Sequence, residues 1–138
     1  MSTALDYIVV DKNFAGVPDV QIKRSKHPES FEVAELTTGT GPVVTSGSTI
    51  EVNYHGQIWQ RLEVFDSSFY NEETVKFPIG VGSVIRGWDE GLVGKTVGSR
   101  VLLIIPPEYG YGKDGMLQAG IFPEDVLVFV VDIIAVKK

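Results

Sequence analysis

The chain has 138 residues, of which 43% are hydrophobic and 22% charged, a composition typical of one globular domain with room for a short appendage. Its 12 Lys and Arg residues against 18 Asp and Glu residues give a net charge of −6, which disfavours binding to the phosphate backbone of nucleic acids. The absence of Cys excludes disulfides, thiolate zinc sites and Cys nucleophiles.

Residues 1–30 are interpreted as an N-terminal extension or linker, and residues 31–138 as the main domain. Two short β-like pieces, at 7–10 and 20–22, are separated by Gly16 and Pro18. The basic run from Lys23 to Lys26 is interpreted as a solvated linker, with contact to an acidic partner as the alternative.

The first residues carry no basic and apolar targeting pattern, and no apolar run approaches the ~18 residues of a membrane span. We therefore expect a cytoplasmic protein without membrane contact. If the chain is cut from a longer precursor, export or anchoring is expected instead.

Three later segments carry strand patterns. Residues 48–55 alternate, with Ile50, Val52 and Tyr54 on one face, as in a half-buried strand. Residues 100–105 and 126–136 are nearly continuous apolar runs, which is typical of central strands. The turn before Val64 has no Asp-Gly or Asn-Gly signal, so we expect a bulge or a longer loop there.

One segment predicts a helix. Ile85, Trp88 and Leu92 recur at i, i+3 and i+7, with Ser83 as a candidate N-cap. Glycines at 87 and 91 each cost about 1 kcal/mol of helix propensity, so packing must hold this helix, and the missing side chains let it lie close to the sheet. One helix against several strands predicts an α+β domain.

The sequence lacks the motifs of metal sites, nucleotide-binding loops and common hydrolases. The histidines, His27 and His55, have no metal-ligand spacing, and no complete glycine-rich phosphate motif or G-x-S-x-G motif is present. The adjacent pairs Glu72-Glu73 and Asp89-Glu90 are interpreted as solvated carboxylates, not as an acid/base pair. We expect no metal and no cofactor.

What remains is a set of aromatic residues on five different segments: Tyr54, Phe65, Trp88, Tyr111 and Phe129. Aromatic residues are common in cores and also line binding pockets. Spacing alone leaves both interpretations open.

The local sequence around these residues resembles the FKBP family, the macrolide-binding prolyl isomerases, over residues 31–138. The matching segments, in order, are VNYHG at 52–56, FDSS at 65–68, FPIG at 77–80, VIRGWDEG at 84–91, VGSR at 97–100, IPPEYGYG at 105–112 and LVF at 127–129. The resemblance implies a curved antiparallel sheet of about five strands wrapped around one short helix.

The resemblance also implies a pocket in which a proline sits on the indole of Trp88. The catalytic residues are then Trp88, Tyr54, Asp66 and Tyr111, with Asp66 tied to Tyr54 and the Tyr111 phenol bonded to a ligand carbonyl. The substrate-binding walls are Phe65, Phe77, Val84, Ile85, Ile121 and Phe129, and the backbone N–H of Ile85 binds a second ligand carbonyl. Asp66 could equally cap a local turn.

The function implied is peptidyl-prolyl cis-trans isomerisation without cofactor or covalent intermediate, assisting protein folding. The expected partners are proline-containing peptides or unfolded chains, with macrolides as candidate ligands, and the expected state is a monomer. An alternative is a binding module or chaperone in which the same pocket captures proline peptides and turnover is incidental.

The chain departs from the family pattern in three places. Val75 replaces a common aromatic residue, and Ser83 replaces a common acidic residue before Val84. The apolar segment 115–120 replaces the usual loop tip, and we expect it to form a mobile flap. These changes bear on macrolide affinity and peptide selectivity more than on isomerisation.

Overall fold

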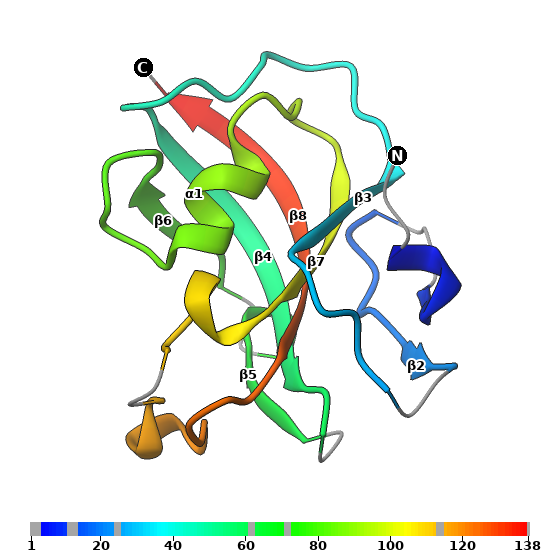
Figure 1. Cartoon of the computed structure of the whole chain (residues 1–138). Coiled ribbons are helices and arrows are strands. Elements are labelled where there is room, and N and C mark those ends of the chain that lie inside the picture. Colours follow the sequence, from blue (N-terminus) through cyan, green and yellow to red (C-terminus); the bar gives the residue numbers. More distant parts are fainter. Residues whose placement is uncertain are drawn as a thin grey trace.

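The computed structural model of the chain describes residues 4–10, 14–23, 26–60, 63–70, 73–112 and 115–137. Four antiparallel strands form the body of the main sheet, in the order β3 (Glu32–Thr37), β7 (Arg100–Ile105), β8 (Leu127–Lys137) and β4 (Thr49–Ile58). At its other edge, β4 pairs with β6 (Val75–Pro78) near one end and with β5 (Val64–Ser67) near the other. The helix α1 (Arg86–Leu92) lies across one face of this curved sheet (Figure 1).

The two apolar runs form the central strands, as predicted, because both of their faces are buried. In β7, Val101, Leu103 and Ile105 join the core beneath α1, whereas Leu102 and Ile104 join a second core on the opposite face. We call the α1 side the inner face and the opposite side the outer face. The main sheet has six strands, one more than expected.

The predicted turn before Val64 contains a bulge. The register of β4 against β5 shifts between Gly56 and Gln57, and the backbone N–H of Ile58 donates to the carbonyl of Glu63 at 2.8 Å. An extra residue of this kind strengthens the local twist and bends the strand. The bulge falls next to Gly56, where the aromatic rings of the inner face gather.

Helix α1 is as short as expected, but Ser83 does not cap it. The N-cap residue is Ile85, whose carbonyl accepts the N–H groups of Trp88 and Asp89 at 3.0 and 3.3 Å, and no side chain caps the helix. The Ser83 prediction was wrong because the preceding loop is held by an acidic residue inside the helix, described below.

The glycines of α1 do bring it close to the sheet. A Cβ atom on Gly87 would lie 2.7 Å from Cδ1 of Ile105, and one on Gly91 would lie 2.6 Å from Cδ2 of Leu103. Such distances are far below van der Waals contact, so a larger residue at either position would force Ile105 or Leu103 to shift. The close approach fixes the height of Trp88 above the sheet.

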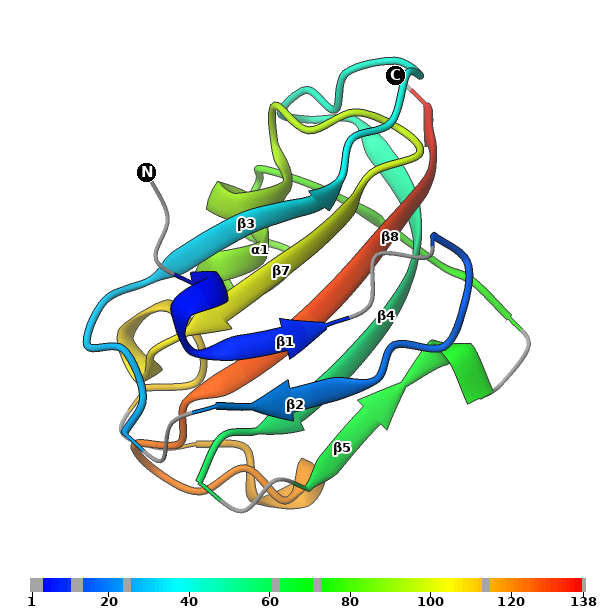
Figure 2. The ribbon, with the colours of Figure 1, turned by 90° about the vertical axis from the view of Figure 1, so that its right-hand side faces the viewer.

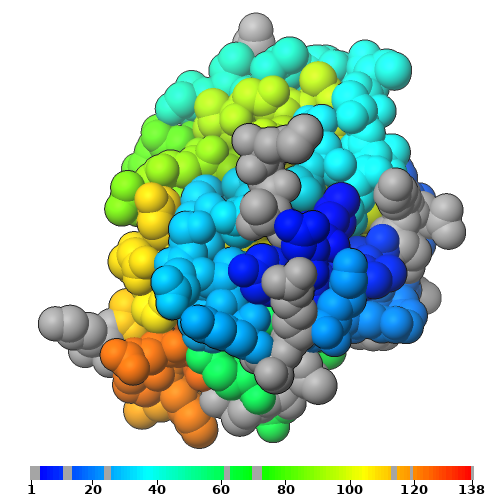
Figure 3. Space-filling view, turned by 45° about the vertical axis from the view of Figure 1, so that its right-hand side comes forward, coloured from blue at the N-terminus to red at the C-terminus, as the bar shows by residue number. Residues whose placement is uncertain are grey.

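The outer face is covered by the N-terminal extension. A 3-10 turn η1 (Ala4–Asp6) leads into β1 (Ile8–Val10), which pairs with β2 (Val20–Ile22), and this small sheet lies over the outer face (Figure 2). Ile8 and Val10 are buried against outer-face residues of β7 and β8. The space-filling view shows the extension lying directly on the rest of the molecule (Figure 3).

The described residues 4–10 and 14–22 therefore add a third layer to the domain. The division of the chain at residue 30 stays a prediction. In the predicted basic run, Lys23 donates to the carbonyl of Leu5 at 3.1 Å, and Lys26 forms an exposed ion pair with Glu29 at 3.7 Å. Residues 24 and 25 lie outside the described residues. No helix among the described residues is long and apolar enough to cross a membrane.

Candidate functional site

A cavity of about 420 Å³ opens on the inner face between α1, the loop before it and one end of the sheet. Its lining comes from β4, β5, β8, α1 and the loops around 82–85 and 111. The lining residues are Tyr54, Phe65, Asp66, Gly82, Ser83, Val84, Ile85, Trp88, Tyr111 and Phe129. Five of these ten are aromatic, so most of the wall is rigid and apolar.

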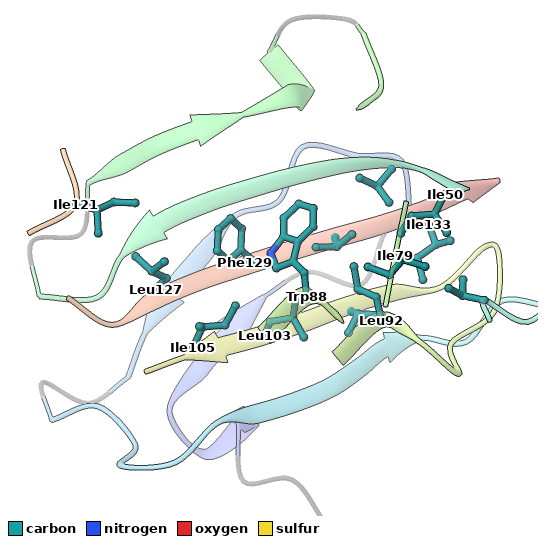
Figure 4. Packing of buried hydrophobic residues seen from close by; sticks show 14 of the residues in the cluster. Ile50, Ile79, Trp88, Leu92, Leu103, Ile105, Ile121, Leu127, Phe129 and Ile133 are labelled. Atoms are coloured by element: carbon teal, nitrogen blue, oxygen red, sulfur yellow. The ribbon is translucent and has the colours of Figure 1, made fainter. Parts of the chain in front are cut away.

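Trp88 lies at the base of the cavity and is 6% exposed. Its indole meets the rings of Tyr54 and Phe129 edge to face, each with centroids 5.2 Å apart, and tilts against Phe77 at the same distance. Among the described residues its Nε1–H has no hydrogen-bond acceptor. Figure 4 shows this nitrogen on the side of the indole that faces Phe129, and the three ring contacts hold the indole in place.

Gly56 makes room for two of the aromatic walls. A Cβ atom at this position would lie 2.7 Å from Cε1 of Phe129 and 2.8 Å from Cζ of Phe65. The rings of these two phenylalanines meet edge to face with centroids 5.5 Å apart, directly against the backbone of β4. The glycine in the VNYHG segment is therefore required by the position of these rings.

Asp66 and two phenols form the polar side of the cavity. The Tyr54 hydroxyl donates a hydrogen bond to the Asp66 carboxylate, across the paired strands β4 and β5. Burial raises the pKa of the Tyr54 phenol well above its usual value, and the hydrogen bond and charge of Asp66 raise it further. Burial, followed by the charge of Asp66, also raises the pKa of the Tyr111 phenol. Both phenols therefore remain protonated hydrogen-bond donors at neutral pH.

Asp89 shapes the rim of the cavity from inside α1. Its two carboxylate oxygens accept the backbone N–H groups of Gly80 and Gly82, at 2.7 and 2.9 Å. Because Gly82 and the three residues after it line the cavity, this carboxylate fixes the loop that forms one wall. The sequence analysis assigned Asp89 to the solvated surface and missed this role.

Comparison with known proteins identifies the family. The sequence model of the FKBP-type peptidyl-prolyl cis-trans isomerases matches residues 41–134, more than half of the chain. The chain belongs to this family. It is a peptidyl-prolyl cis-trans isomerase by class, and the resemblance found in the sequence is confirmed.

Its relatives include FKBPs of similar length. The chain is 37% identical over 119 residues to an FK506-binding protein of Streptomyces anulatus, covering 86% of this chain and 96% of that protein. It is 34% identical to a probable FK506-binding protein of Corynebacterium glutamicum, covering 86% and 97% of the two chains. It spans about half of FK506-binding protein 2 of Aspergillus fumigatus, with 46% identity over 72 residues that cover 52% and 54%.

Solved structures confirm the FKBP fold. AtFKBP13 aligns with a TM-score of 0.71 and 34% identity, covering 83% of this chain and 98% of that one. FkpA of Escherichia coli aligns with a TM-score of 0.66 and 37% identity, covering 78% of this chain and 47% of that one. The predicted curved antiparallel sheet around one short helix is therefore correct, although it has more strands than five.

The structure brings eight of the ten predicted site residues together in the FKBP cavity. Phe77 touches Trp88 from outside the lining, and Ile121 is 2% exposed and packed in the inner-face core. Ser83 also lines the cavity, although the sequence analysis treated it as a candidate N-cap and as a departure from the family pattern. Gly82 was missed because a glycine carries no side-chain signal.

Arg86 and Arg100 both pair with carboxylates other than that of Asp66. Arg86 forms an ion pair with Glu90 and lies 4.2 Å from the ring centroid of Tyr109, while Arg100 pairs with Asp132. Asp66 therefore presents its carboxylate at the edge of the FKBP cavity with Tyr54 as its hydrogen-bond donor.

The segment expected to form a flap is closed into a turn. The backbone of Met116 exchanges two hydrogen bonds with Ile121, at 2.8 and 3.0 Å, around the 3-10 turn η4 (Leu117–Ala119). Leu117 and Phe122 are 66% and 51% exposed. Backbone hydrogen bonds thus fix a turn whose apolar side chains are exposed to solvent. The mobility of this segment stays a prediction. No described His, Asp or Glu side chains gather in groups that could hold a metal ion.

Proposed function

We propose that the cavity binds a proline residue with its ring against the indole of Trp88 and speeds rotation about the preceding peptide bond. The observation that carries this proposal is the open cavity of about 420 Å³ above Trp88. It is large enough for a proline and its flanking carbonyls, since ligand pockets start at roughly 300 Å³.

The obstacle to rotation is electronic. An X-Pro bond loses amide resonance when it twists, which leaves a barrier of roughly 20 kcal/mol and times of tens to hundreds of seconds. Water solvates the planar, charge-separated amide well. An apolar cavity favours the less polar twisted amide relative to the planar one, so removal from water lowers the barrier.

The aromatic walls of this chain supply that environment. Phe65, Trp88 and Phe129 surround the space with ring carbons, and their mutual contacts keep it open. A hydrogen bond that is stronger to the twisted amide adds binding specific to the transition state.

Tyr111 is the donor available for such a bond. The hydroxyl of Tyr54 is already committed to Asp66, and the raised pKa of Tyr111 keeps its proton in place at neutral pH. We propose that the Tyr111 hydroxyl donates a hydrogen bond to a carbonyl next to the rotating bond. Asp66, held by Tyr54, places a fixed negative charge at the edge of the cavity. No acid, base or nucleophile is needed.

The proposed substrates are X-Pro bonds in folding protein chains, with an apolar residue before the proline. The names of the relatives make FK506 a probe for the same cavity. Competition between FK506 and a proline peptide would link binding of both to one site.

The test measures cis-trans exchange of a short Ala-Leu-Pro-Phe peptide with Tyr111→Phe and a matched control, Tyr109→Phe. Tyr109 stacks on Phe31 with centroids 4.7 Å apart and lies outside the cavity, so its hydroxyl should not matter. We expect Tyr111→Phe to lower kcat/KM about 3- to 10-fold, the value of one hydrogen bond, and Tyr109→Phe to retain activity.

Failure of the folded wild-type protein to accelerate exchange would overturn the proposal. If the peptide bound at the cavity without acceleration, the site would be a proline-binding module.

A further inference from the structure

The residues that follow Asp66 are anchored from the outer side of the sheet. Ser68 accepts the backbone N–H of Tyr54 on its Oγ at 2.7 Å and donates to Oδ1 of Asn53 at 3.1 Å. Phe69 places its ring 5.7 Å from the guanidinium carbon of Arg100, within the range of a cation–π contact. The backbone that carries Asp66 is therefore held by contacts that lie outside the cavity.

Arg100 is itself a buried charge with a fixed partner. It is 0% exposed, and its Nε and Nη2 donate to the two carboxylate oxygens of Asp132 at 2.7 and 2.9 Å. A bidentate pair of this kind has a defined geometry, and a buried pair depends on further hydrogen bonds to offset its desolvation.

The N-terminal extension supplies those further hydrogen bonds. In the described part of the segment that leads into β2, the N–H of Ala15 donates to Oδ2 of Asp132 at 2.7 Å. Figure 2 shows β2 on the outer face of the main sheet. The carbonyl of Gly16 accepts from Nη2 of Arg100. Ala15 has a φ of 73°, a strained value for a non-glycine residue, which these bonds hold in place.

Contacts thus run without a gap from the extension to the cavity. Gly16 and Ala15 bind the Arg100–Asp132 pair, the guanidinium faces Phe69, and Phe69 adjoins Ser68, which binds the backbone of Tyr54. Tyr54 in turn holds Asp66.

We propose that Ala15, Gly16 and Phe69 are positioning residues for the Asp66–Tyr54 pair, so that the N-terminal extension takes part in isomerisation. This inference rests on the proposed function of the cavity. Without the extension, Nη2 of Arg100 would lose one acceptor and Asp132 would lose one donor, so the pair would be held less firmly and Phe69 would rest on a less fixed guanidinium. Asp66 would then occupy a broader range of positions, which lowers kcat more than it weakens binding on Trp88.

The test is a double-mutant cycle on the full chain, read as kcat and KM for peptide exchange. Ala15→Pro removes the N–H that binds Asp132 and cannot adopt a positive φ, whereas Ala15→Gly keeps the N–H and accepts that φ. Phe69→Leu removes the ring beside Arg100, whereas Phe69→Tyr keeps it. The two conservative variants are the matched controls.

We expect Ala15→Pro and Phe69→Leu each to lower kcat about 3- to 10-fold with little change in KM, and both controls to retain activity. Because the two residues act through one guanidinium, kcat of the double variant should be no lower than kcat of the more damaging single variant. If Ala15→Pro fails to fold, Phe69→Leu alone still tests the step from Arg100 to Asp66, and a wild-type kcat in that variant would overturn the inference.

The inference would be overturned if the fold-loss of kcat in the double variant equalled the product of the two single losses. It would also be overturned if both single variants kept the wild-type kcat. If Tyr111→Phe lowers activity while these variants do not, the proposed function stands and only the inference fails. If the wild-type protein shows no exchange activity, the proposed function itself is lost.

Discussion

The two faces of the main sheet are both apolar, but they are covered in opposite ways. The outer face is closed by the extension, and two of its buried polar residues, Arg100 and Asp132, bind one another and the backbone of that extension. The inner face is covered by one helix of seven residues, which leaves a cavity of about 420 Å³.

The difference shows what keeps a cavity open in a small domain. Aliphatic side chains on the outer face interlock with the added layer, whereas the inner face is walled by rings that meet edge to face and cannot collapse without losing those contacts. Breaking the outer-face arrangement should therefore lower stability, together with the fall in kcat inferred above, whereas breaking the inner-face arrangement should lower ligand binding.

Arg100→Ala should have the largest effect on stability, because it leaves Asp132 as an unpaired buried charge. We expect the free energy of unfolding to fall by about 3–5 kcal/mol, measured by denaturant titration. The double substitution Arg100→Met with Asp132→Leu replaces both charges by apolar groups and should recover most of that loss. A loss below about 1 kcal/mol in the single variant would show that the pair does not control the outer face.

Gly56→Ala should damage the inner face with a smaller cost in stability. The added methyl group would lie 2.7 Å from Phe129 and 2.8 Å from Phe65, so these groups must shift, and we expect the rings to move into the cavity. We expect a destabilisation of about 1–3 kcal/mol and a larger relative loss of FK506 or peptide binding, measured by Trp88 fluorescence. Unchanged binding would mean that the rings can shift away from the cavity instead.

Much of this architecture could be predicted from the sequence because it depends on the pattern of apolar residues within short segments. The apolar runs of β7 and β8 have no polar face, so both sides of each strand had to be buried. The i, i+3, i+7 spacing of Ile85, Trp88 and Leu92 identified the helix, and the local segments around the aromatic residues identified the cavity.

The features that were missed depend on contacts between distant segments. The sequence does not show that Arg100 is buried and paired, because Asp132 lies 32 positions away and meets it only through the β7–β8 register. Asp89 was interpreted as solvated because no local sequence pattern shows that the loop with Gly80 and Gly82 folds back onto its carboxylate. An apolar residue such as Ile121 has the same sequence pattern whether it lines a cavity or lies in the core. Only the packing in the folded structure distinguishes these two positions.

The neighbouring acidic residues Asp89 and Glu90 offer a sharper comparison within one helix. Asp89→Ala frees the N–H groups of Gly80 and Gly82 and should loosen the rim, whereas Glu90→Gln removes only an exposed ion pair with Arg86. We expect Asp89→Ala to weaken peptide binding about 5- to 10-fold, measured as KM or by titration, since charged hydrogen bonds contribute roughly 1.5–3 kcal/mol and part is regained from water. Glu90→Gln should change it less than about 2-fold. Equal effects would show that the rim does not depend on Asp89.

The smallest expected effect is a pH dependence of stability that arises on the outer side of β4. His55 is buried, with its ring nitrogens 3.2 Å from Oγ of Ser67 and 3.1 Å from Oε1 of Gln57. Burial lowers the pKa of His55 below the ordinary value of 6.5, although the hydrogen bond with Gln57 opposes this.

Between the lowered pKa and 6.5 the unfolded chain binds a proton that the folded chain does not, so the free energy of unfolding decreases as the pH falls through this window. The slope from one such group is at most about 1.4 kcal/mol per pH unit, and the contribution becomes constant below the folded pKa. Denaturant titrations across this range should show a steeper decline for the wild-type protein than for His55→Gln, which has no proton to gain at this position. Parallel curves would mean that the folded protein accommodates a charged imidazole there, and that this buried site is more accessible to water than its packing indicates.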